Sequence, residues 1–494
     1  MTGRAQAFTA AILFFSVSFV IMATAHTYET LVGGQVVYAF GFAGTSVLAP
    51  IVIADMTDVS NRGFFQALYN LPEIINIFAA GAAAQELLEQ QQWRWAYGMI
   101  PIMVIGTSAP LLVGLWYGQI KEKRKQKENA PDELPEKGQL EGKNILQKLY
   151  WLAIEIDLIG SILLVAALCL ILLPLILART SWGGWGSSLT IGTLVAGAAS
   201  LVLFVIWEWK FSIKSIIPIT HWKSTTPLLG VLSLSIKKAL VSMIMFQYFL
   251  TYLQVTRGVT PKAATYLERG YNVTFIGFQI IVGYVMKRTR RWRPIVIAGC
   301  CIIILGMGLM IPARRPTASN AFLAVSQVIT GIGAGMMHIP LMVGVQSTVP
   351  RKDLAIATAL QQLGQSIATS IGSAIAGSIW NSLIPAAFAR HIPGQYDYQK
   401  IVKSIPYTRS LPKAQLDGVI AAYAEVMNTV SIVMVCVAIL PLIVSIPIKS
   451  FGFKEEEEED QLTATSSRED VSNEKKTTEE TPSQEDVQIS TKVA

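Results

Sequence analysis

Residues 326–383 read SQVITGIGAGMMHIPLMVGVQSTVPRKDLAIATALQQLGQSIATSIGSAIAGSIWNSL and decide the fold. They form two apolar segments, each long enough to cross a bilayer, joined by a short charged turn. Pro350 ends the first segment because proline cannot continue a helix. Arg351, Lys352 and Asp353 follow it, and their charges are costly to place in hydrocarbon. The chain must therefore return to water here, which predicts a membrane protein built of helices.

Small residues mark both segments of this stretch. In the first, three glycines leave one helix face without side chains, so that a neighbouring helix can approach closely. In the second, a seam of small residues continues over several turns. The glycines concerned are Gly331, Gly333 and Gly335, followed by Gly364, Gly372 and Gly377. The pattern predicts tightly packed helices in a protein that crosses the membrane several times.

The composition of the whole chain agrees with a lipid environment. Of its 494 residues, 52% are hydrophobic and only 15% are charged, and the mean hydropathy is +0.46. A water-soluble domain of this size could not bury so much apolar surface. The net charge is +7, but the basic residues lie between apolar segments and form no clustered face with interleaved aromatic residues. They indicate membrane orientation, and we expect no nucleic-acid partner.

Twelve apolar runs have about the length of a membrane helix, 18 to 25 residues, which predicts an all-α, polytopic membrane protein. The runs cover 6–25, 31–54, 64–86, 96–117, 152–178, 189–209, 228–252, 270–286, 294–312, 320–345, 355–380 and 420–447. With a cytoplasmic N-terminus, the basic groups at 121–127 and 287–293 both fall in internal connections, as the positive-inside rule requires. The C-terminus is then cytoplasmic, and we expect the plasma membrane or an endosomal or vacuolar membrane.

The spans divide the chain into five parts. We expect an N-terminal helical half at 1–118, a polar cytoplasmic linker at 119–151, two additional helices at 152–209 and a C-terminal six-helix half at 210–450. Within that half, 381–419 forms a long external loop with several prolines and tyrosines. The tail at 451–494 is rich in Glu, Ser and Thr and poor in aromatic residues, which predicts disorder.

Glu73 lies in the middle of a span, in the sequence YNLPEIINIF. An ionisable side chain costs about 2.5 to 3.5 kcal/mol at that depth, and Pro72 breaks the helix beside it. We expect Glu73 to bind a proton near the midplane, where transporters often have broken helices. Asn70 and Asn76 extend its polar face and are expected to line the substrate cavity. The alternative is a protonated Glu73 that only bonds to a neighbouring helix.

Lys237 and Lys238 interrupt a later span, in LSIKKALVSMIMF. One interpretation is that they face a water-filled cavity and attract an anionic or oxygen-rich ligand. The other is that the helix begins at Ala239 and the lysines precede it. Glu268 and Arg269 are expected at the external start of another helix, where an ion pair would lie at the membrane interface.

Three uncharged polar residues within spans also suit a cavity wall. They are Gln35, Tyr38 and Gln327. Such side chains form hydrogen bonds without carrying charge, but they also join neighbouring helices at about 0.6 kcal/mol each. Both interpretations remain open for them.

A charged turn is expected to close the cytoplasmic gate. Asp55, Asp58 and Arg62 lie in the turn ADMTDVSNRG. The basic turn KRTRRWRP contains Arg290 and Arg291, which could pair with the two acids. The alternative is a solvated loop without a gating role.

The chain contains no recognisable motif for catalysis or metal binding. Its four cysteines and four histidines are scattered without ligand spacing, so we expect no protein-bound metal and no cofactor. A phosphate-binding Gly-Lys-Ser/Thr loop, an HExxH pair and a nucleophile elbow are all missing from the sequence. The sequence predicts a transporter that is driven by a gradient, and no enzyme.

The order of motifs resembles the major facilitator superfamily and, within it, the fungal siderophore-iron transporter family. The motifs are GIGAG at 331–335, the run at 346–358, the pair Trp380-Asn381, GGQVVYAFGFAG at 33–44 and the turn at 54–63. The resemblance covers most of 3–450. Gln35 and Tyr38 stand where the superfamily usually has an arginine-bearing motif, and the antiporter-type glycine-proline motif is missing around Gly81, so the resemblance to drug exporters is weaker.

The resemblance implies import of ferric hydroxamate siderophores together with protons. The iron would be carried as a chelate, held by the oxygens of the siderophore and not by the protein. External-loop tyrosines in similar proteins are proposed to gate the substrate, which by position nominates Tyr396, Tyr398 and Tyr407. The segment Gly3-Arg4 resembles the end of a basic turn that follows a second helix, so we expect the twelve spans to be the last twelve of a fourteen-helix plan. We expect a monomer.

Two other functions remain open at this point. One is an exporter of glutathione or drugs by proton exchange on the same fold, which efflux without siderophore binding would favour. The other is a non-transporting remnant, which ligand binding without flux would favour.

Overall fold

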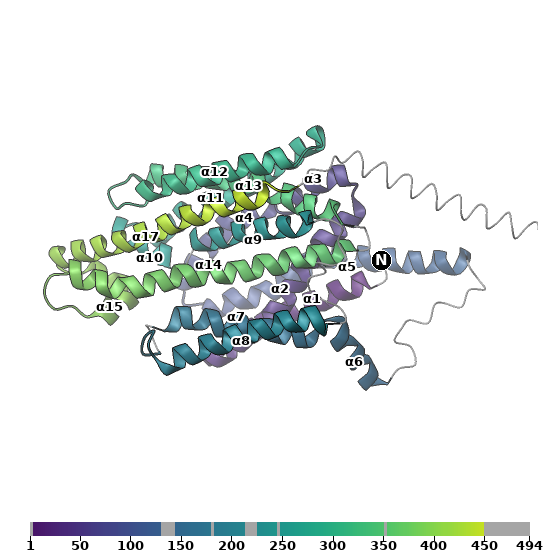
Figure 1. Cartoon of the computed structure of the whole chain (residues 1–494), viewed down its shortest axis with the longest axis horizontal. Helices are drawn as coiled ribbons and strands as arrows, with labels where there is room; N and C mark the ends of the chain where they lie inside the picture. Colours follow the sequence, from purple (N-terminus) through teal and green to yellow (C-terminus); the bar gives the residue numbers. More distant parts are fainter. Residues whose placement is uncertain are drawn as a thin grey trace, which may run out of the picture.

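Long α-helices lie side by side along the long axis of the molecule (Figure 1). The structure is a computed structural model that describes residues 3–129, 144–178, 182–212, 225–244, 248–349 and 353–448. Within these ranges every regular element is a helix, which confirms the predicted all-α fold. The helices are α1 (Arg4–Ala23), α2 (Tyr28–Met56), α3 (Val59–Tyr69), α4 (Pro72–Glu89), α5 (Trp93–Asn129), α6 (Ile145–Glu155), α7 (Leu158–Leu177), α8 (Ser188–Lys210), α9 (Thr226–Ile244), α10 (Tyr248–Arg257), α11 (Pro261–Thr289), α12 (Arg293–Ala313), α13 (Asn320–Ser347), α14 (Leu354–His391), α15 (Tyr398–Lys403), α16 (Ile405–Arg409) and α17 (Lys413–Ser445).

Ten candidate membrane spans occur among the described residues, with α9 and α10 counted together as one. The two other predicted passes are α11 and the α3–α4 pair. α11 is 29 residues long, but Asn272 and Gln279 make its middle more polar. The run predicted at 64–86 is divided at Asn70 and Leu71, and α4 begins at Pro72. Proline has no N–H to donate to the preceding turn, so the break falls where the sequence predicts it.

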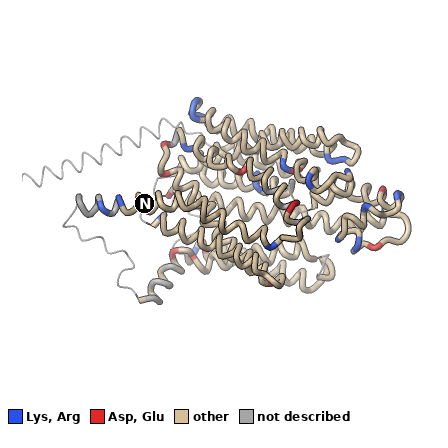
Figure 2. Tube along the Cα trace, turned by 180° about the vertical axis from the view of Figure 1, so that it is seen from behind, with Lys and Arg blue, Asp and Glu red and all other residues tan. Residues whose placement is uncertain are grey.

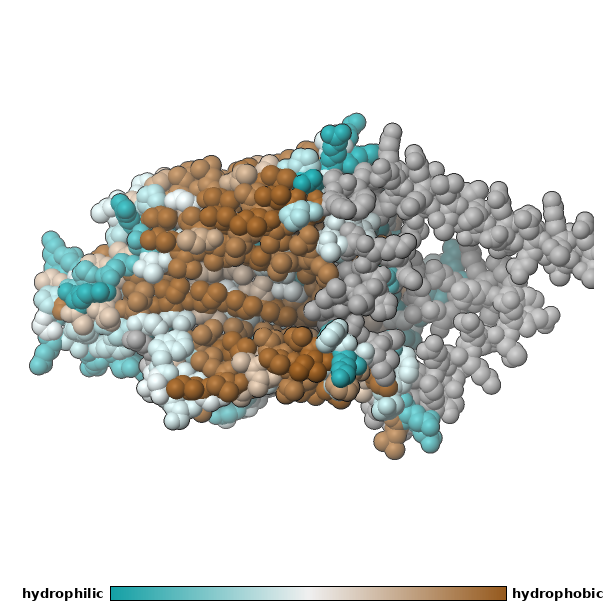
Figure 3. Space-filling model, viewed as in Figure 1, coloured by the Kyte–Doolittle hydropathy of each residue, from teal (hydrophilic) through white to brown (hydrophobic). Residues whose placement is uncertain are grey.

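The surface of the bundle shows an apolar belt between two polar ends. Figure 3 shows hydrophobic side chains across the middle of this face and hydrophilic ones at the end near α15. Most charged residues in Figure 2 likewise lie toward the ends of the helices, with a few in the middle. Apolar side chains facing lipid and charged ones facing water are what a spanning bundle requires. We call the end with α15 and α16 the loop end, and the opposite end, where α1 begins, the basic end.

The helices pack as an N-terminal group, α1–α5, and a C-terminal group, α9–α17. In the first, Phe8 and Ile12 of α1 pack on Ala49 of α2. The larger core belongs to the second group, and Ala67 of α3 joins it. α7 and α8 form a hairpin, and α7 lies along α14. The two groups meet where α3 and α4 cross α11.

Glycines allow the close packing that the 326–383 stretch predicts. A Cβ atom on Gly333 would lie 2.8 Å from Gly299 O of α12, and one on Gly335 would lie 2.7 Å from Phe275 O of α11. A Cβ on Gly331 would overlap α11 as well.

The second seam of small residues is shorter than predicted. Gly364 and Gly372 of α14 face α9, where a Cβ on either glycine would meet Ser235 or Ser242. Gly377 has open space where its Cβ would be, so the prediction of a tight contact there is wrong. Gly364 and Gly372 therefore serve packing against α9.

Several predicted boundaries differ from the structure. α14 continues through Pro385 to His391, and α17 begins at Lys413, so the external loop is 392–412 and not 381–419. Ala386, Ala387 and Ala389 favour continued helix after Pro385, and α15 and α16 fold within the loop. At the other end, α5 reaches Asn129 and α6 forms within the predicted linker. The charged turn at 350–352 and the tail at 451–494 lie outside the described residues.

Candidate substrate and proton site

Glu73 lies at the interface of the two helix groups, close to the midplane. It occupies the first turn of α4, directly after the break. With a rise of about 1.5 Å per residue, Glu73 lies about 21 Å from Val59 along the α3–α4 pair, and Lys238 lies about 18 Å from Thr226 along α9. The side chain of Glu73 is exposed, and its carboxylate interacts electrostatically with Lys238 and with the Tyr69 hydroxyl. An acid of one group thus interacts electrostatically with a base of the other at similar depth.

The side chains of the two lysines of α9 have different neighbours. Consecutive residues of a helix do not share a face. Lys238 is half-buried and is near Glu73. Lys237 is only 2% exposed, and its Nζ lies 3.2 Å from His338 Nδ1 of α13 and 5.0 Å from the centre of the Phe275 ring. Both lysines lie inside α9, so the alternative in which the helix begins at Ala239 is wrong.

Asn70 and Asn76 have different surroundings. Asn70 Nδ2 donates a 2.8 Å hydrogen bond to Gln279 Oε1 of α11, which links the two groups. Asn76 is exposed one turn after Glu73 and on the same side of α4. Asn76 therefore extends the polar face of Glu73, whereas Asn70 joins helices.

A second set of amides joins the groups closer to the basic end. Gln66 Nε2 of α3 donates to Gln346 Oε1 of α13 at 3.1 Å. Gln346 Nε2 in turn donates to Thr358 Oγ1 of α14 at 3.1 Å. Beside them, a Cβ on Gly283 would lie 2.9 Å from the Gly63 carbonyl oxygen, so α3 and α11 touch along their backbones. These contacts close the α3 side of the interface near the basic end.

Gln35, Tyr38 and Gln327 are not brought together with Glu73 by their described contacts. Gln35 Nε2 lies 3.2 Å from Met22 Sδ of α1. The Tyr38 ring packs 5.2 Å from that of Phe15 and 5.6 Å from that of Phe42. Gln327 is fully buried beside α11. Their interpretation as contacts between helices fits this placement better than a cavity wall.

The proposed external gate residues divide into two sets. The rings of Tyr396 and Tyr398 lie 6.1 Å and 5.6 Å from that of Phe388 in α14. Tyr407 lies in α16, and its backbone N–H donates a hydrogen bond to Ser404 Oγ. Burial raises the pKa of Tyr398, and nearby tyrosine hydroxyls add to the effect. Tyr396 and Tyr398 therefore cover the loop end of α14, and Tyr407 lies in a short helix that Ser404 caps.

The residues predicted to form the cytoplasmic gate contact other partners than those expected. Asp55 forms an ion pair with Arg4 of α1, within its own group. The Arg62 guanidinium is buried and donates to Ala54 O at 3.3 Å, and Asp58 precedes α3 as its cap residue. On the other side, Arg290 ends α11 in a left-handed conformation and Arg291 is exposed. The pairing predicted for Asp55 with the basic turn is therefore replaced by Arg4, which lies at the adjacent helix start.

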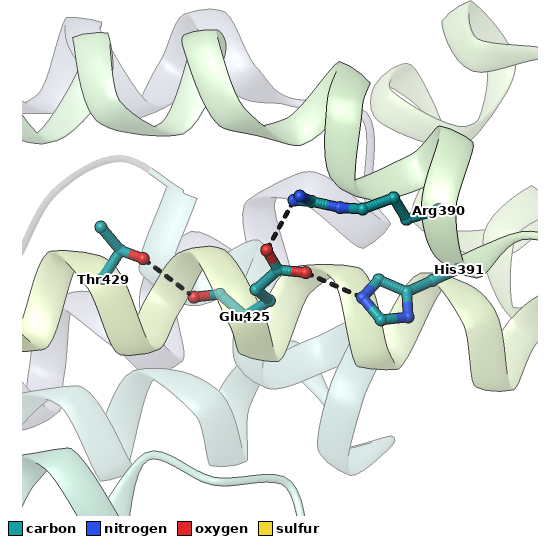
Figure 4. Close-up of polar contacts among 4 residues, drawn as sticks. All are labelled: Arg390, His391, Glu425 and Thr429. Atoms are coloured by element: carbon teal, nitrogen blue, oxygen red, sulfur yellow. Dashed lines mark hydrogen bonds and ion pairs between the residues drawn. The ribbon is translucent and has the colours of Figure 1, made fainter.

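Glu425 is an ionic site that the sequence interpretation missed. It lies in α17, where Oε1 accepts a 2.6 Å hydrogen bond from Arg390 Nη2 and Oε2 lies 2.8 Å from His391 Nε2 (Figure 4). Thr429 Oγ1 donates to the Glu425 carbonyl. The pattern Arg390-His391 before a proline-containing loop, with an acid in the next span, was the available signal. The cluster ties the C-terminus of α14 to α17.

Glu268 also lies at a different position in its helix from the one predicted. α11 begins at Pro261, so Glu268 lies within the helix and is only 6% exposed. It interacts electrostatically with Arg269 and with Arg314 at the end of α12. The helix start was predicted too late because Lys262 and Glu268 make the first turns polar.

Among the described residues, no group of three or more His, Cys, Asp or Glu side chains could hold a metal ion. The site around Glu73 and Lys238 offers one carboxylate and one ammonium group. The carboxylate can bind or release a proton, and the ammonium group can donate hydrogen bonds to an anionic oxygen.

The family model and the curated relatives agree on the class of this chain. The family model described as Major Facilitator Superfamily matches residues 2–373. The MFS siderochrome iron transporter C of Aspergillus fumigatus is 30% identical over 450 residues, which cover 89% of this chain and 72% of that protein. The siderophore iron transporter mirC of Emericella nidulans is 30% identical over 449 residues, with the same coverage. The inward-facing, occupied structure of a bacterial homologue of the human lysosomal transporter Spinster aligns with 89% of this chain and 81% of that one, at 13% identity and a TM-score of 0.44.

Proposed function

The chain belongs to the Major Facilitator Superfamily, among the siderophore iron transporters of fungi, and from this premise we propose that it is a secondary transporter that imports ferric siderophores together with protons. The two helix groups would open alternately to either side of the membrane. Iron crosses as a chelate whose ligands are the siderophore oxygens, so the protein needs to bind only the outer surface of the complex.

The observation that supports this proposal most strongly is the electrostatic interaction between Glu73 and Lys238. The two charges belong to different helix groups and lie at similar depth. While Glu73 is ionised, it neutralises Lys238. When Glu73 binds a proton, Lys238 loses that partner and can bind an anionic oxygen of the chelate. The proton and the chelate therefore bind together, which is the requirement for symport.

The contacts nearer the two ends supply the gates in this proposal. The bonds from Gln66 to Gln346 and from Asn70 to Gln279 must break before the α3 side opens toward the basic end. Tyr396 and Tyr398, which pack on Phe388, cover the loop end. The basic end and the C-terminus would face the cytoplasm, in the plasma membrane or an endosomal or vacuolar membrane, and the protein would act as a monomer.

Uptake by intact cells tests the proposed function. The full-length protein is expressed in a fungal host without siderophore uptake of its own, and radioiron-labelled ferrichrome serves as the trihydroxamate probe. We expect accumulation of radioiron that a protonophore abolishes. Efflux of glutathione or of a drug without any ferrichrome uptake would instead support the exporter function, and ferrichrome binding without flux would support the non-transporting remnant.

A further inference from the structure

Lys237 and His338 form a pair that the mechanism above leaves unused. Lys237 is almost completely buried, and its Nζ lies 3.2 Å from His338 Nδ1. The His338 ring packs 5.4 Å from Phe275, over which the Lys237 ammonium group also lies. A narrow gap without room for a water molecule adjoins the lysine. An aliphatic core would be cheaper to build at this position, so two basic groups in contact there call for an explanation.

The chemistry of this hydrogen bond limits how many protons the pair can hold. A lysine ammonium group only donates hydrogen bonds, so His338 Nδ1 must offer a lone pair to accept one. If both side chains were protonated, two cations would lie 3.2 Å apart with no lone pair between them. The interior of a protein does not tolerate such an arrangement. The pair therefore holds one proton or none.

The groups around the pair connect it to the interface of the two helix groups. Lys238 follows on α9 and interacts electrostatically with both members of the pair, and Glu73 of α4 interacts with Lys238. From α11 the pair meets Phe275, and Tyr271 lines the narrow gap beside Lys237. The remaining residues that line this gap are Leu240, Val241, Ile303, Met307, Thr330 and Ala334. Lys238 is thus the charge through which Glu73 can act on the pair.

We propose that Lys237 and His338 bind one proton between them and release it when the two helix groups separate. This rests on the proposed transport function. While Glu73 neutralises Lys238, the pair can keep its positive charge. When Glu73 moves away with its group, the uncompensated charge of Lys238 repels the shared proton. An N–H bond of the pair then breaks, its electrons stay on nitrogen, and the proton passes to water in the opened cleft.

Magnetic resonance of the histidines tests the pair without depending on transport. The sequence contains four histidines, so isotope-labelled imidazoles of the full-length protein in detergent give four sets of signals. His338→Gln identifies the signal of interest. We expect Lys237→Gln to move the pH at which the His338 signal titrates by at least about one pH unit, and Lys262→Gln, at an exposed lysine of α11, to leave it in place. An unchanged titration in Lys237→Gln overturns the proposal.

Flux measurements separate this inference from the proposed function. Proteoliposomes are assayed for exchange of radioiron-labelled ferrichrome, which needs alternating access alone, and for accumulation driven by a pH gradient. Lys237→Gln and His338→Gln should keep exchange within about twofold and lose at least about tenfold in accumulation and in ferrichrome-driven proton movement. Full accumulation in both variants contradicts the inference. A wild-type protein without ferrichrome exchange, but with the shifted titration, contradicts only the proposed function.

Discussion

At the scale of residues, a small number of charged side chains lie within membrane spans, where charge is most costly. Opposite charges there offset part of that cost. Glu73 and Lys238 each raise the cost of a membrane span by about 2.5 to 3.5 kcal/mol when alone. They interact electrostatically across the interface of the two helix groups, which offsets part of that cost. Both could be identified from the sequence, because a charge in an apolar run is visible without a structure. His338 could not, since nothing in GMMHIP shows that Lys237 lies beside it.

Glu73→Gln keeps the shape of the side chain and removes its ability to ionise. We expect ferrichrome accumulation to fall at least about tenfold, with binding retained, because proton binding no longer controls Lys238. Wild-type accumulation should rise as the external pH falls, and that of the variant should not. Radioiron uptake across a range of external pH measures both. Glu29→Gln, at an exposed acid in the first turn of α2, is the matched control. Unchanged accumulation in Glu73→Gln would exclude this residue as the proton carrier.

Lys238 is expected to determine affinity for the chelate. Lys238→Gln removes the positive charge and should weaken binding of ferrichrome about tenfold, the size of a charge-assisted hydrogen bond of 1.5 kcal/mol or slightly less. Lys238→Arg keeps the charge and should retain most of the affinity. Equilibrium binding to the purified proteins measures the difference. Equal affinity in the wild type and in Lys238→Gln would place the substrate elsewhere.

At the scale of helices, patterns within one segment were predictable and contacts between segments were not. The break before Pro72 and the glycine faces of α13 follow from local chemistry, and the structure has both. The pairing of Gln66 with Gln346 joins residues 280 positions apart, and no single segment reveals it. The extension of α14 through Pro385 was also missed, because a proline in a helix is tolerated when tertiary contacts hold both sides. Arg390 and His391 make such a contact with Glu425.

Gly331→Ala tests the packing of α13 on α11. The added methyl group would overlap Thr274 and the Tyr271 carbonyl, where backbone cannot easily move. We expect a loss of about 1 to 3 kcal/mol in the free energy of unfolding, as for other overpacked interiors. Gly377→Ala provides a control in α14, since nothing lies within 4 Å of its added Cβ. Thermal unfolding in detergent compares them, and equal stability of the two variants would show that the close approach of α11 and α13 is not required.

At the scale of the whole molecule, the proposed mechanism requires the fold to expose one site to the two sides of the membrane in turn. The apolar belt and polar ends follow from composition and could be predicted (Figure 3). Of the twelve predicted spans, ten have the length and hydropathy of a membrane helix among the described residues. The relation between the groups could not, because it depends on where α3 and α4 cross α11. In the conformation described, Gly63 and Gly283 touch and the amide bonds beside them are formed. The α3 side is therefore closed near the basic end, and transport requires a second conformation in which it is open.

The distance between α3 and α11 at the basic end is the most direct measurement of that claim. Spin labels are attached at Asp58→Cys and Arg291→Cys, two exposed positions, after the four native cysteines are replaced. The distance between the labels is then measured by pulsed electron paramagnetic resonance at neutral and acidic pH, with and without ferrichrome. We predict a short distance that matches the closed contact and a second, longer one whose population changes when proton and ferrichrome bind together. A single distance under all conditions, in a protein that still transports ferrichrome, would contradict alternating opening at this interface.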